Sequence, residues 1–216
     1  MIKGIRNHFC IALLCAMLVP FPAFAQTSGD VKIGKQIWMS KNLDVSTFRN
    51  GEPIPQAKTE EEWVNAGENE QPAWCYYDND PENGKKYGKL YNWYAVNDAR
   101  GLAPVGYRIP TDADWGILEY ISGKKHLMYK GLKKTDQKTK NSGFDAVFGG
   151  IRTYDGYFEE GHGIGYWWSS TEFDEYSASY FLLTNKGYYF QECFPNGEKL
   201  PFEEKKAGYS VRCIKD

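Results

Sequence analysis

Cysteine and histidine are the side chains best suited to covalent or metal chemistry, and the sequence holds few of them. Beyond residue 25 there remain Cys75, Cys193 and Cys213, together with His126 and His162. No C-x-x-C or H-x-x-x-H spacing occurs, so a structural zinc site lacks its ligands. In an oxidising compartment the three cysteines are disulfide candidates that allow one bond and leave one thiol over.

Oxygen ligands gather in residues 78–84 (DNDPENG). Calcium collects several oxygen ligands on a tight turn, which makes Asp78 and Asp80 candidate ligands. Against the EF-hand template, however, the glycine is misplaced at Gly84, and Lys89 stands where a glutamate is needed. Asx turns on a solvated loop explain the same residues without a metal. The sequence therefore predicts no required cofactor and keeps calcium as the alternative.

Aromatic rings and carboxylates in the second half of the chain suggest carbohydrate binding. Trp and Tyr rings stack on the apolar faces of sugars, while carboxylates accept hydrogen bonds from sugar hydroxyls. The competing explanation is core packing, because consecutive Trp167 and Trp168 point to opposite faces of a strand and at least one must be buried. The candidate ligand-binding residues are Tyr154, Tyr157, Trp167, Glu172 and Asp174.

The first 25 residues have the order of a secretory signal peptide. Lys3 and Arg6 precede an apolar run, and Ala23-Phe24-Ala25 supplies small residues for the peptidase. The apolar run is shorter than the roughly 20 residues that span a bilayer. We therefore expect an exported protein that begins at Gln26, is periplasmic, cell-surface or secreted, and has no transmembrane segment.

The remaining residues, 26–216, fit a single domain. Removal of Lys3 and Arg6 leaves 24 basic against 28 acidic residues, a net charge of −4. No basic stripe for nucleic acid is present. Asp155 and Glu159 could pair as glycosidase carboxylates but do not differ from surface acids, so the sequence predicts no catalytic residue.

Several local patterns predict the elements that position these residues. Residues 31–38 alternate around Gly34 and predict a hairpin, with Val31, Ile33, Ile37 and Met39 as candidates for burial.

Two helix starts are also predicted, at Thr59 with its following glutamates and at Thr111 with Asp114 reaching back. The spacing of Leu90, Trp93 and Tyr94 predicts a helix over residues 87–96. After Gly143, frequent glycines predict short strands and turns, with residues 208–214 as the last strand. The result is an α+β fold with a loop-rich C-terminal half.

Segments spread over nearly the whole of residues 26–216 resemble, in order, the Fibrobacter succinogenes major paralogous domain. They are IGKQIWM (33–39) with Asn42-Leu43, YGKLYNW (87–93), RIPTD (108–112) with Trp115, SGF (142–144), Gly150 with Arg152, WWSST (167–171) and SVRC (210–213).

This resemblance implies an exported bacterial domain without an established enzymatic activity. Residues 107–115 also resemble the formylglycine-generating enzyme family, which implies a C-type-lectin-like fold: a twisted antiparallel sheet flanked by two helices, with a long loop region for any binding site. Other members place a cysteine just before the proline that is Pro104 here. Because this chain has Ala103, the resemblance leaves Cys213 to pair with Cys75 or Cys193, or to stay free.

The resemblances also bear on which functions are expected. Calcium-dependent lectins use a Glu-Pro-Asn or Gln-Pro-Asp segment, but residues 194–196 read Phe-Pro-Asn. Formylglycine-type oxidases bind copper through two cysteine thiolates, for which Cys193 and Cys213 are the candidates. We expect a secreted non-enzymatic binding module for extracellular glycan or a surface protein. A structural or adhesion domain is the alternative, and a formylglycine-type oxidase is the third hypothesis.

Overall fold

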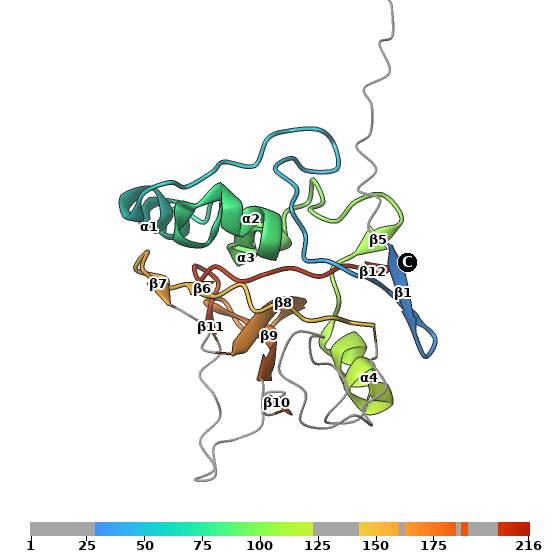
Figure 1. Ribbon diagram of the computed structural model, residues 1–216. Coiled ribbons are helices and arrows are strands. Elements are labelled where there is room, and N and C mark those ends of the chain that lie inside the picture. The colour runs from blue at the N-terminus through green and yellow to red at the C-terminus, as the bar shows by residue number, and fades with distance from the viewer. Residues whose placement is uncertain (1–28, 123–142, 160–162, 185–186, 190–202) are drawn as a thin grey trace, which may run out of the picture.

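A computed structural model describes residues 29–122, 143–159, 163–184, 187–189 and 203–216. The helices α1, α2 and α3 lie on one side of the C-terminal segment, and the strands β8 and β9 lie on the other (Figure 1). The predicted signal peptide lies outside the described residues. Within those residues we find no helix with the length and apolar character needed to cross a membrane.

The helices begin where the sequence supplies caps. Thr59 and Glu62 form the predicted capping box, because Thr59 Oγ1 accepts from Glu62 N at 3.1 Å and Glu62 Oε2 accepts from Thr59 N at 3.2 Å. The Thr111 start is confirmed as well, with its contacts described below. The helices are α1 (Glu60–Glu68), α2 (Pro81–Tyr87), α3 (Trp93–Val96) and α4 (Asp112–Ser122), with a 3-10 turn at Tyr77–Asn79.

One antiparallel sheet joins the two ends of the described chain. Its strand order is β1-β2-β12-β5, and Figure 1 shows β1, β12 and β5 together near the C-terminus. The hairpin pairs Ile33 with Gln36, so the predicted strands and turn are confirmed. The strands are β1 (Asp30–Ile33), β2 (Gln36–Met39), β5 (Tyr107–Arg108) and β12 (Ile214–Lys215).

Burial within this hairpin differs in part from the prediction. Ile33 and Met39 are buried, whereas Val31 and Ile37 are only partly buried. Gln36 and Trp38 are buried on the face that Ile33 shares, because the two-residue turn sets Val31 opposite Trp38. The polar Gln36 tolerates this position since its amide is hydrogen-bonded at both ends.

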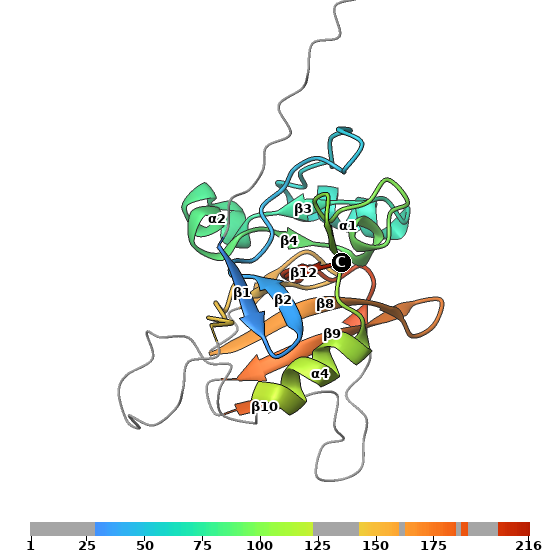
Figure 2. The ribbon, with the colours of Figure 1, turned by 90° about the vertical axis from the view of Figure 1, so that its right-hand side faces the viewer.

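The second sheet is built on a long hairpin of β8 (Ile164–Glu172) and β9 (Ser177–Thr184), which crosses the molecule in Figure 2. Trp167 packs into one core cluster and Trp168 into another, and both are fully buried. Core therefore covers both faces of β8. The flanking strands are β10 (Gly187–Tyr189) and β11 (Glu203–Glu204), while β3 (Trp74–Cys75) pairs with β4 (Leu90–Tyr91) and β6 (Ile151–Arg152) with β7 (Phe158–Glu159).

The α+β class is confirmed: the described residues form four separate antiparallel sheets and four α-helices. The single helix predicted over residues 87–96 is wrong. Leu90 and Tyr91 pair with β3, and Asn92 then starts the short helix α3 by accepting from Ala95 N at 3.1 Å.

Residues 208–214, predicted as a strand, form regular strand structure only from Ile214. The preceding residues are extended and buried, but their backbone hydrogen bonds are made to several different segments. Tyr209 bonds with Tyr91, Ser210 O accepts from Trp168 N at 3.0 Å, and Val211 O accepts from Leu43 N at 2.8 Å. This central C-terminal segment therefore ties the helical side of the molecule to the β8–β9 side.

Candidate ligand-binding hollow

Asn42 is the centre of a buried hydrogen-bond group that joins distant segments. Its Oδ1 accepts from Trp167 Nε1 at 2.9 Å and Arg212 Nη2 at 2.8 Å, and its Nδ2 donates to the Tyr87 carbonyl at 2.9 Å. Arg212 also donates to the Phe144 carbonyl at 2.6 Å. Burial lowers the pKa of Arg212 to about 9, so the guanidinium remains charged at neutral pH. Because these side chains are buried, the group stabilises the interior.

Arg152 forms a second buried group of the same kind. Its guanidinium donates to the carbonyls of Ala57 at 2.9 Å, Thr59 at 2.6 Å and Gly156 at 3.1 Å, and it lies over the Trp63 ring at 4.9 Å. The carbonyl of Thr59 belongs to the N-cap of α1. Arg152 therefore fixes the start of that helix against the β6–β7 pair.

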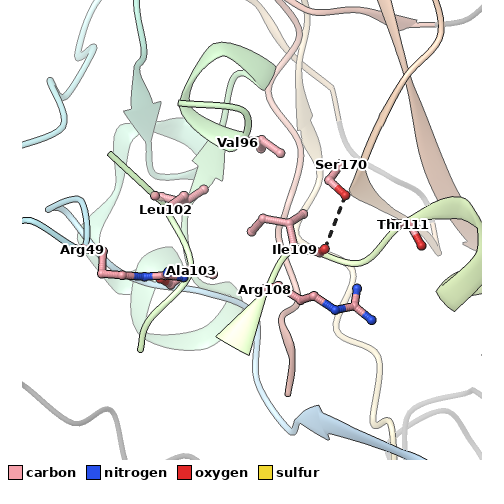
Figure 3. Close-up of a pocket in the computed structure, with 9 residues that line it drawn as sticks. Arg49, Val96, Leu102, Ala103, Arg108, Ile109, Thr111 and Ser170 are labelled. Carbon is pink, nitrogen blue, oxygen red and sulfur yellow. Dashed lines mark hydrogen bonds between the residues drawn. The ribbon is translucent and has the colours of Figure 1, made fainter. Parts of the chain in front are cut away.

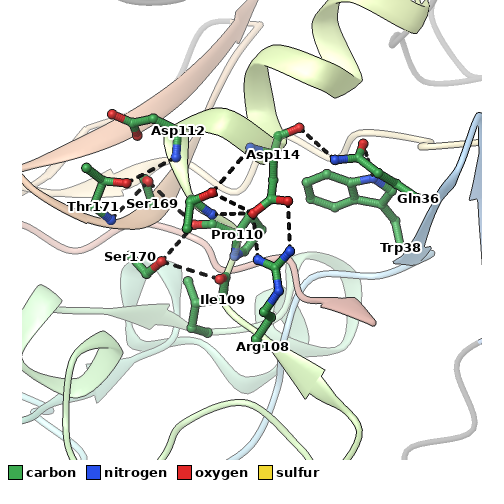
Figure 4. A network of polar contacts seen from close by, with 11 residues as sticks. Gln36, Trp38, Arg108, Ile109, Pro110, Asp112, Asp114, Ser169, Ser170 and Thr171 are labelled. Atoms are coloured by element: carbon green, nitrogen blue, oxygen red, sulfur yellow. Dashed lines mark hydrogen bonds and ion pairs between the residues drawn. The ribbon is translucent and has the colours of Figure 1, made fainter. Parts of the chain in front are cut away.

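A third polar network lies nearer the surface, around the start of α4 (Figure 4). Arg108 donates to both carboxylate oxygens of Asp114, at 2.5 and 2.8 Å, and Thr111 N donates to Asp114 Oδ2 at 2.8 Å. Burial acts to raise the pKa of Asp114, but the hydrogen bonds from Arg108 and Thr111 outweigh it and bring the pKa to about 2. Asp114 is therefore ionised at neutral pH and holds Arg108 in place.

The end of β8 is tied to this network through its hydroxyl residues, as Figure 4 shows. Ser170 N donates to the Pro110 carbonyl at 2.8 Å, and Asp112 N donates to Thr171 Oγ1 at 3.1 Å. The RIPTD and WWSST segments are far apart in sequence but adjacent here. Their contact forms one wall of a surface hollow.

This hollow, which we call the Arg49 hollow, has a volume of about 270 Å³. Its aliphatic wall comes from Val96, Leu102, Ala103 and Ile109, and Figure 3 shows Arg49 and Arg108 on opposite sides of Ile109. The described residues that line it are Arg49, Val96, Gly101, Leu102, Ala103, Arg108, Ile109, Thr111 and Ser170. None of these described side chains is acidic, so cationic and hydroxyl groups adjoin the aliphatic lining.

The two arginines of the hollow are held differently. Arg108 is paired with the Asp114 carboxylate, whereas Arg49 donates through Nε to the Ala103 carbonyl and through Nη2 to the Tyr107 carbonyl, both at 3.0 Å. Carbonyl oxygens orient a guanidinium without neutralising it. Arg49 forms no ion pair with any residue in the described ranges.

Nearby acids are occupied by a third arginine. Arg100 pairs with Asp98 at 2.7 Å and with Glu52 at 2.8 Å. The hydrogen bonds from Arg100 lower the pKa of Asp98. Because Arg100 holds both carboxylates, neither of them pairs with Arg49, whose charge stays without an ion-pair partner among the described residues.

The assignment of Trp167 to a ligand site is wrong. Its side chain is fully buried, its Nε1 is bonded to Asn42, and its ring packs against Phe144 and Phe181. A ring enclosed on both faces cannot stack on a sugar. The physical reason is that both faces of β8 are covered, which an alternating strand pattern does not reveal.

The other predicted residues are exposed but do not come together. Tyr154 and Tyr157 lie in the β6–β7 turn and are 53% and 57% exposed. Glu172 and Asp174 lie at the β8–β9 turn, which is on the opposite side of the molecule from the yellow β6–β7 pair in Figure 2. The five residues therefore do not form one surface.

The two carboxylates of the β8–β9 turn have structural partners. Glu172 pairs with Lys205, and Asp174 Oδ1 accepts from Ser177 Oγ at 2.6 Å, which lowers the pKa of Asp174. The exposed rings beside them are Phe173 and Tyr176, at 48% and 72% exposure. Neither ring is among the residues selected from the sequence.

The calcium candidates lie on a solvated turn. Asp80 is the N-cap of α2, since its Oδ1 accepts from Glu82 N at 2.9 Å, and Asp78 has a positive φ of 54°. Within the described ranges, no group of three or more His, Cys, Asp or Glu side chains is arranged to hold a metal ion. The contact of Asp80 with Glu82 N is an Asx-type turn, as in the alternative to calcium binding.

Cys75 and Cys213 are free and buried, so Cys213 follows the alternative in which it stays unpaired, while Cys193 lies outside the described residues. Burial raises the pKa of Cys75 to about 11, against a weaker opposing effect of Arg152, and raises that of Cys213 to about 12. Both thiols are therefore protonated at neutral pH. Reactive or metal-binding cysteines need the opposite environment.

The sequence did not predict the residues that line the hollow as a ligand site, and the reason is physical. Arg49 stands beside an Asn-Gly turn, where a single arginine resembles any solvated surface residue. Ser170 and Thr111 belong to conspicuous segments, but they line the same hollow only because β8 packs against the start of α4. The signal in the sequence is the RIPT segment itself, which places Arg108 and Thr111 close together.

These observations define an α+β domain with buried arginine groups and a small surface hollow. The chain belongs to the Fibrobacter succinogenes major domain family, whose model matches residues 31–215. No curated protein and no solved structure matches the sequence. The segments that carry the family resemblance include Asn42, Arg152 and Arg212 of the buried groups and Arg108 of the network near the surface.

Proposed function

We propose that the protein is an exported, non-enzymatic binding module and that the Arg49 hollow is its ligand site. The observation that carries this proposal is the uncompensated guanidinium of Arg49 at the edge of an aliphatic surface hollow. A few polar groups around an apolar concave surface are the usual composition of a ligand site. The volume of about 270 Å³ suits a group of the size of one sugar or one amino-acid residue.

Export is proposed on the order of the first 25 residues, with positive charge, an apolar run and small residues before Gln26. A C-type-lectin-like fold is proposed on the resemblance of residues 107–115. The β2–β12 pairing, which brings the two ends of the described chain into one sheet, is compatible with it. An experimental structure superposed on lectin-like domains will test the fold.

The burial of Cys213 favours binding over oxidase chemistry. A copper site of thiolates requires deprotonated sulfur, and burial raises the pKa of Cys213 to about 12. Glycan binding through exposed rings retains Tyr154 and Tyr157 as candidates, but these residues line no part of the Arg49 hollow. The hollow therefore takes precedence as the site.

The test is a screen of the purified protein on glycan and peptide arrays, with and without calcium. A matched variant, Ser170→Phe, places a ring in the hollow at a partly exposed position. We expect at least one class of ligand to bind the wild type and to lose tenfold or more in affinity with the variant, with an unchanged melting temperature. Tyr157→Ala is the control and should bind normally.

Silence on both arrays would overturn the binding proposal and favour the structural or adhesion domain. Binding that survives Ser170→Phe but is lost with Tyr157→Ala would move the site to the β6–β7 turn. A calcium requirement would revive Asp78 and Asp80 as ligands.

A further inference from the structure

We propose that the ligand of the Arg49 hollow is a peptide that ends in a free carboxylate beside a small aliphatic side chain. In this arrangement Arg49 binds the carboxylate and the aliphatic wall contacts the terminal side chain. The inference rests on the proposed function and names the ligand class of the same site.

Charge identifies the carboxylate. Arg49 uses Nε and Nη2 to reach the carbonyls of Ala103 and Tyr107, and its Nη1 donates to no residue in the described part of the chain. Two anchored nitrogens fix the guanidinium plane, so its remaining N–H groups are oriented before a ligand arrives. A guanidinium held by neutral acceptors keeps its full charge for an anionic group, and charge-assisted hydrogen bonds are stronger than neutral ones.

Arg108 has a different role. Both carboxylate oxygens of Asp114 accept from its guanidinium, at 2.5 and 2.8 Å. Asp216 also lies near enough to raise the pKa of Arg108, after the larger effect of Asp114. With these acids around it, Arg108 shapes the wall of the hollow and positions Ile109, while Arg49 is the group that meets the ligand anion.

The walls identify the rest of the ligand. Val96, Leu102 and Ile109 line the hollow as the edge of the apolar core and are at most 8% exposed, and Ser170 and Thr111 add hydroxyl groups to the lining (Figure 3). Sugars are commonly held by aromatic stacking, yet no aromatic side chain is among the described lining residues. In a peptide that ends in a small aliphatic residue, the carboxylate can bind Arg49 while the side chain contacts the aliphatic wall. An acidic sugar would instead place hydroxyl groups against that wall. Capture of a C-terminal carboxylate is an established mode of peptide recognition.

The experiment measures the affinity of the full exported protein for N-acetyl-Gly-Gly-Val, with either a free carboxylate or a terminal amide, by calorimetry. A galacturonate oligomer is the acidic-sugar comparison. We expect the free acid to bind at least tenfold more tightly than the amide or the oligomer. Arg49→Gln should weaken the acid about tenfold and change the amide by less than twofold, and Arg49→Lys should restore part of the loss.

Lys35→Gln is the matched control, because it removes one exposed positive charge from the β1–β2 turn, which forms no part of the hollow. It should leave both affinities unchanged. Equal binding of acid and amide, or equal loss of both with Arg49→Gln, would overturn the carboxylate assignment. Tighter binding of the galacturonate oligomer would overturn the peptide assignment while leaving the hollow as the site. Failure of the proposed function itself would appear separately, as binding unaffected by Ser170→Phe.

Discussion

The buried arginines and the arginines of the hollow use the same side chain for different purposes. Arg152 and Arg212 are at most 1% exposed and donate to carbonyl and amide oxygens from several segments. Arg49 also donates to carbonyls, but at the surface and beside an apolar hollow. The difference is that Arg49 has an N–H donor left for a ligand and lies in solvent-accessible space, whereas Arg152 and Arg212 are enclosed.

The buried arginines and Arg49 also differ in their relation to the family segments. Arg152 and Arg212 belong to the segments that carry the family resemblance, and their contacts assemble the interior. Arg49 lies outside those segments, yet it is the arginine with an uncompensated charge at the hollow. The proposed ligand site therefore combines residues of the family segments, such as Arg108 and Ser170, with Arg49 from outside them.

The largest expected effect comes from Trp167, the residue that distinguishes core from site most sharply. Trp167→Ala should cost about 3–5 kcal/mol of unfolding free energy, because it leaves a cavity and removes a donor from Asn42. Urea unfolding followed by fluorescence will measure it. Tyr157→Ala, an exposed aromatic, should stay within about 0.5 kcal/mol of wild type. Similar values for the two variants would place Trp167 at the surface.

A somewhat smaller effect is expected for Arg152→Met. Methionine keeps apolar contact with Trp63 but leaves the carbonyls of Ala57 and Thr59 without their donor. At about 1–3 kcal/mol for each unsatisfied buried acceptor, partly relieved by solvent near the Thr59 end, the loss should be about 2–4 kcal/mol. Chemical denaturation is the measurement, and a loss below about 1 kcal/mol would show that Arg152 is not a structural centre.

The smallest of these effects depends on pH. The pKa of Asp114 is lowered from 3.8 to about 2 in the folded protein, so its ion pair stabilises the fold above pH 3.8 and this stabilisation is lost as the pH falls through 2. Since Arg108 is 42% exposed, solvent screening limits the contribution to about 1–2 kcal/mol. Asp114→Asn should therefore be less stable than wild type at pH 7, with the gap narrowing below pH 4. A constant gap down to pH 2.5 would contradict this account.

Local chemistry was predictable from the sequence where partners are close in the chain. The capping box of Thr59 and Glu62 and the Thr111–Asp114 cap both involve residues three apart, and both form as expected. The hairpin around Gly34 is a similar case. Such contacts depend on backbone geometry that neighbouring residues determine.

Long-range packing was not predictable in the same way. Leu90 has helical spacing with Trp93, but pairing with Cys75 makes it part of a strand. Trp167 and Trp168 alternate like residues of a half-exposed strand, yet two core clusters cover β8 on both faces. In each case the deciding partner is distant in sequence, so a local pattern contains no information about it.

The hollow needed the assembled fold for the same reason. Arg49, Val96, Ile109 and Ser170 come from four separate segments, and nothing in the sequence shows that these segments meet. The predicted ligand residues, by contrast, rest on residue type and on their place in the loop-rich half of the chain. Residue type correctly predicted exposed rings at Tyr154 and Tyr157. It contains no information on their distance from the carboxylates of the β8–β9 turn.

The most direct test of the central claim compares two matched substitutions, Arg212→Met and Arg49→Met, by urea unfolding and by peptide binding. Arg212→Met should lose about 2–4 kcal/mol of unfolding free energy, because the Phe144 carbonyl and Asn42 lose buried donors, while Arg49→Met should lose no more than about 1 kcal/mol. Arg49→Met should instead lose about tenfold in affinity for the free-acid peptide. Equal destabilisation by the two substitutions, with ligand affinity unchanged in Arg49→Met, would contradict the division between structural and ligand-binding arginines.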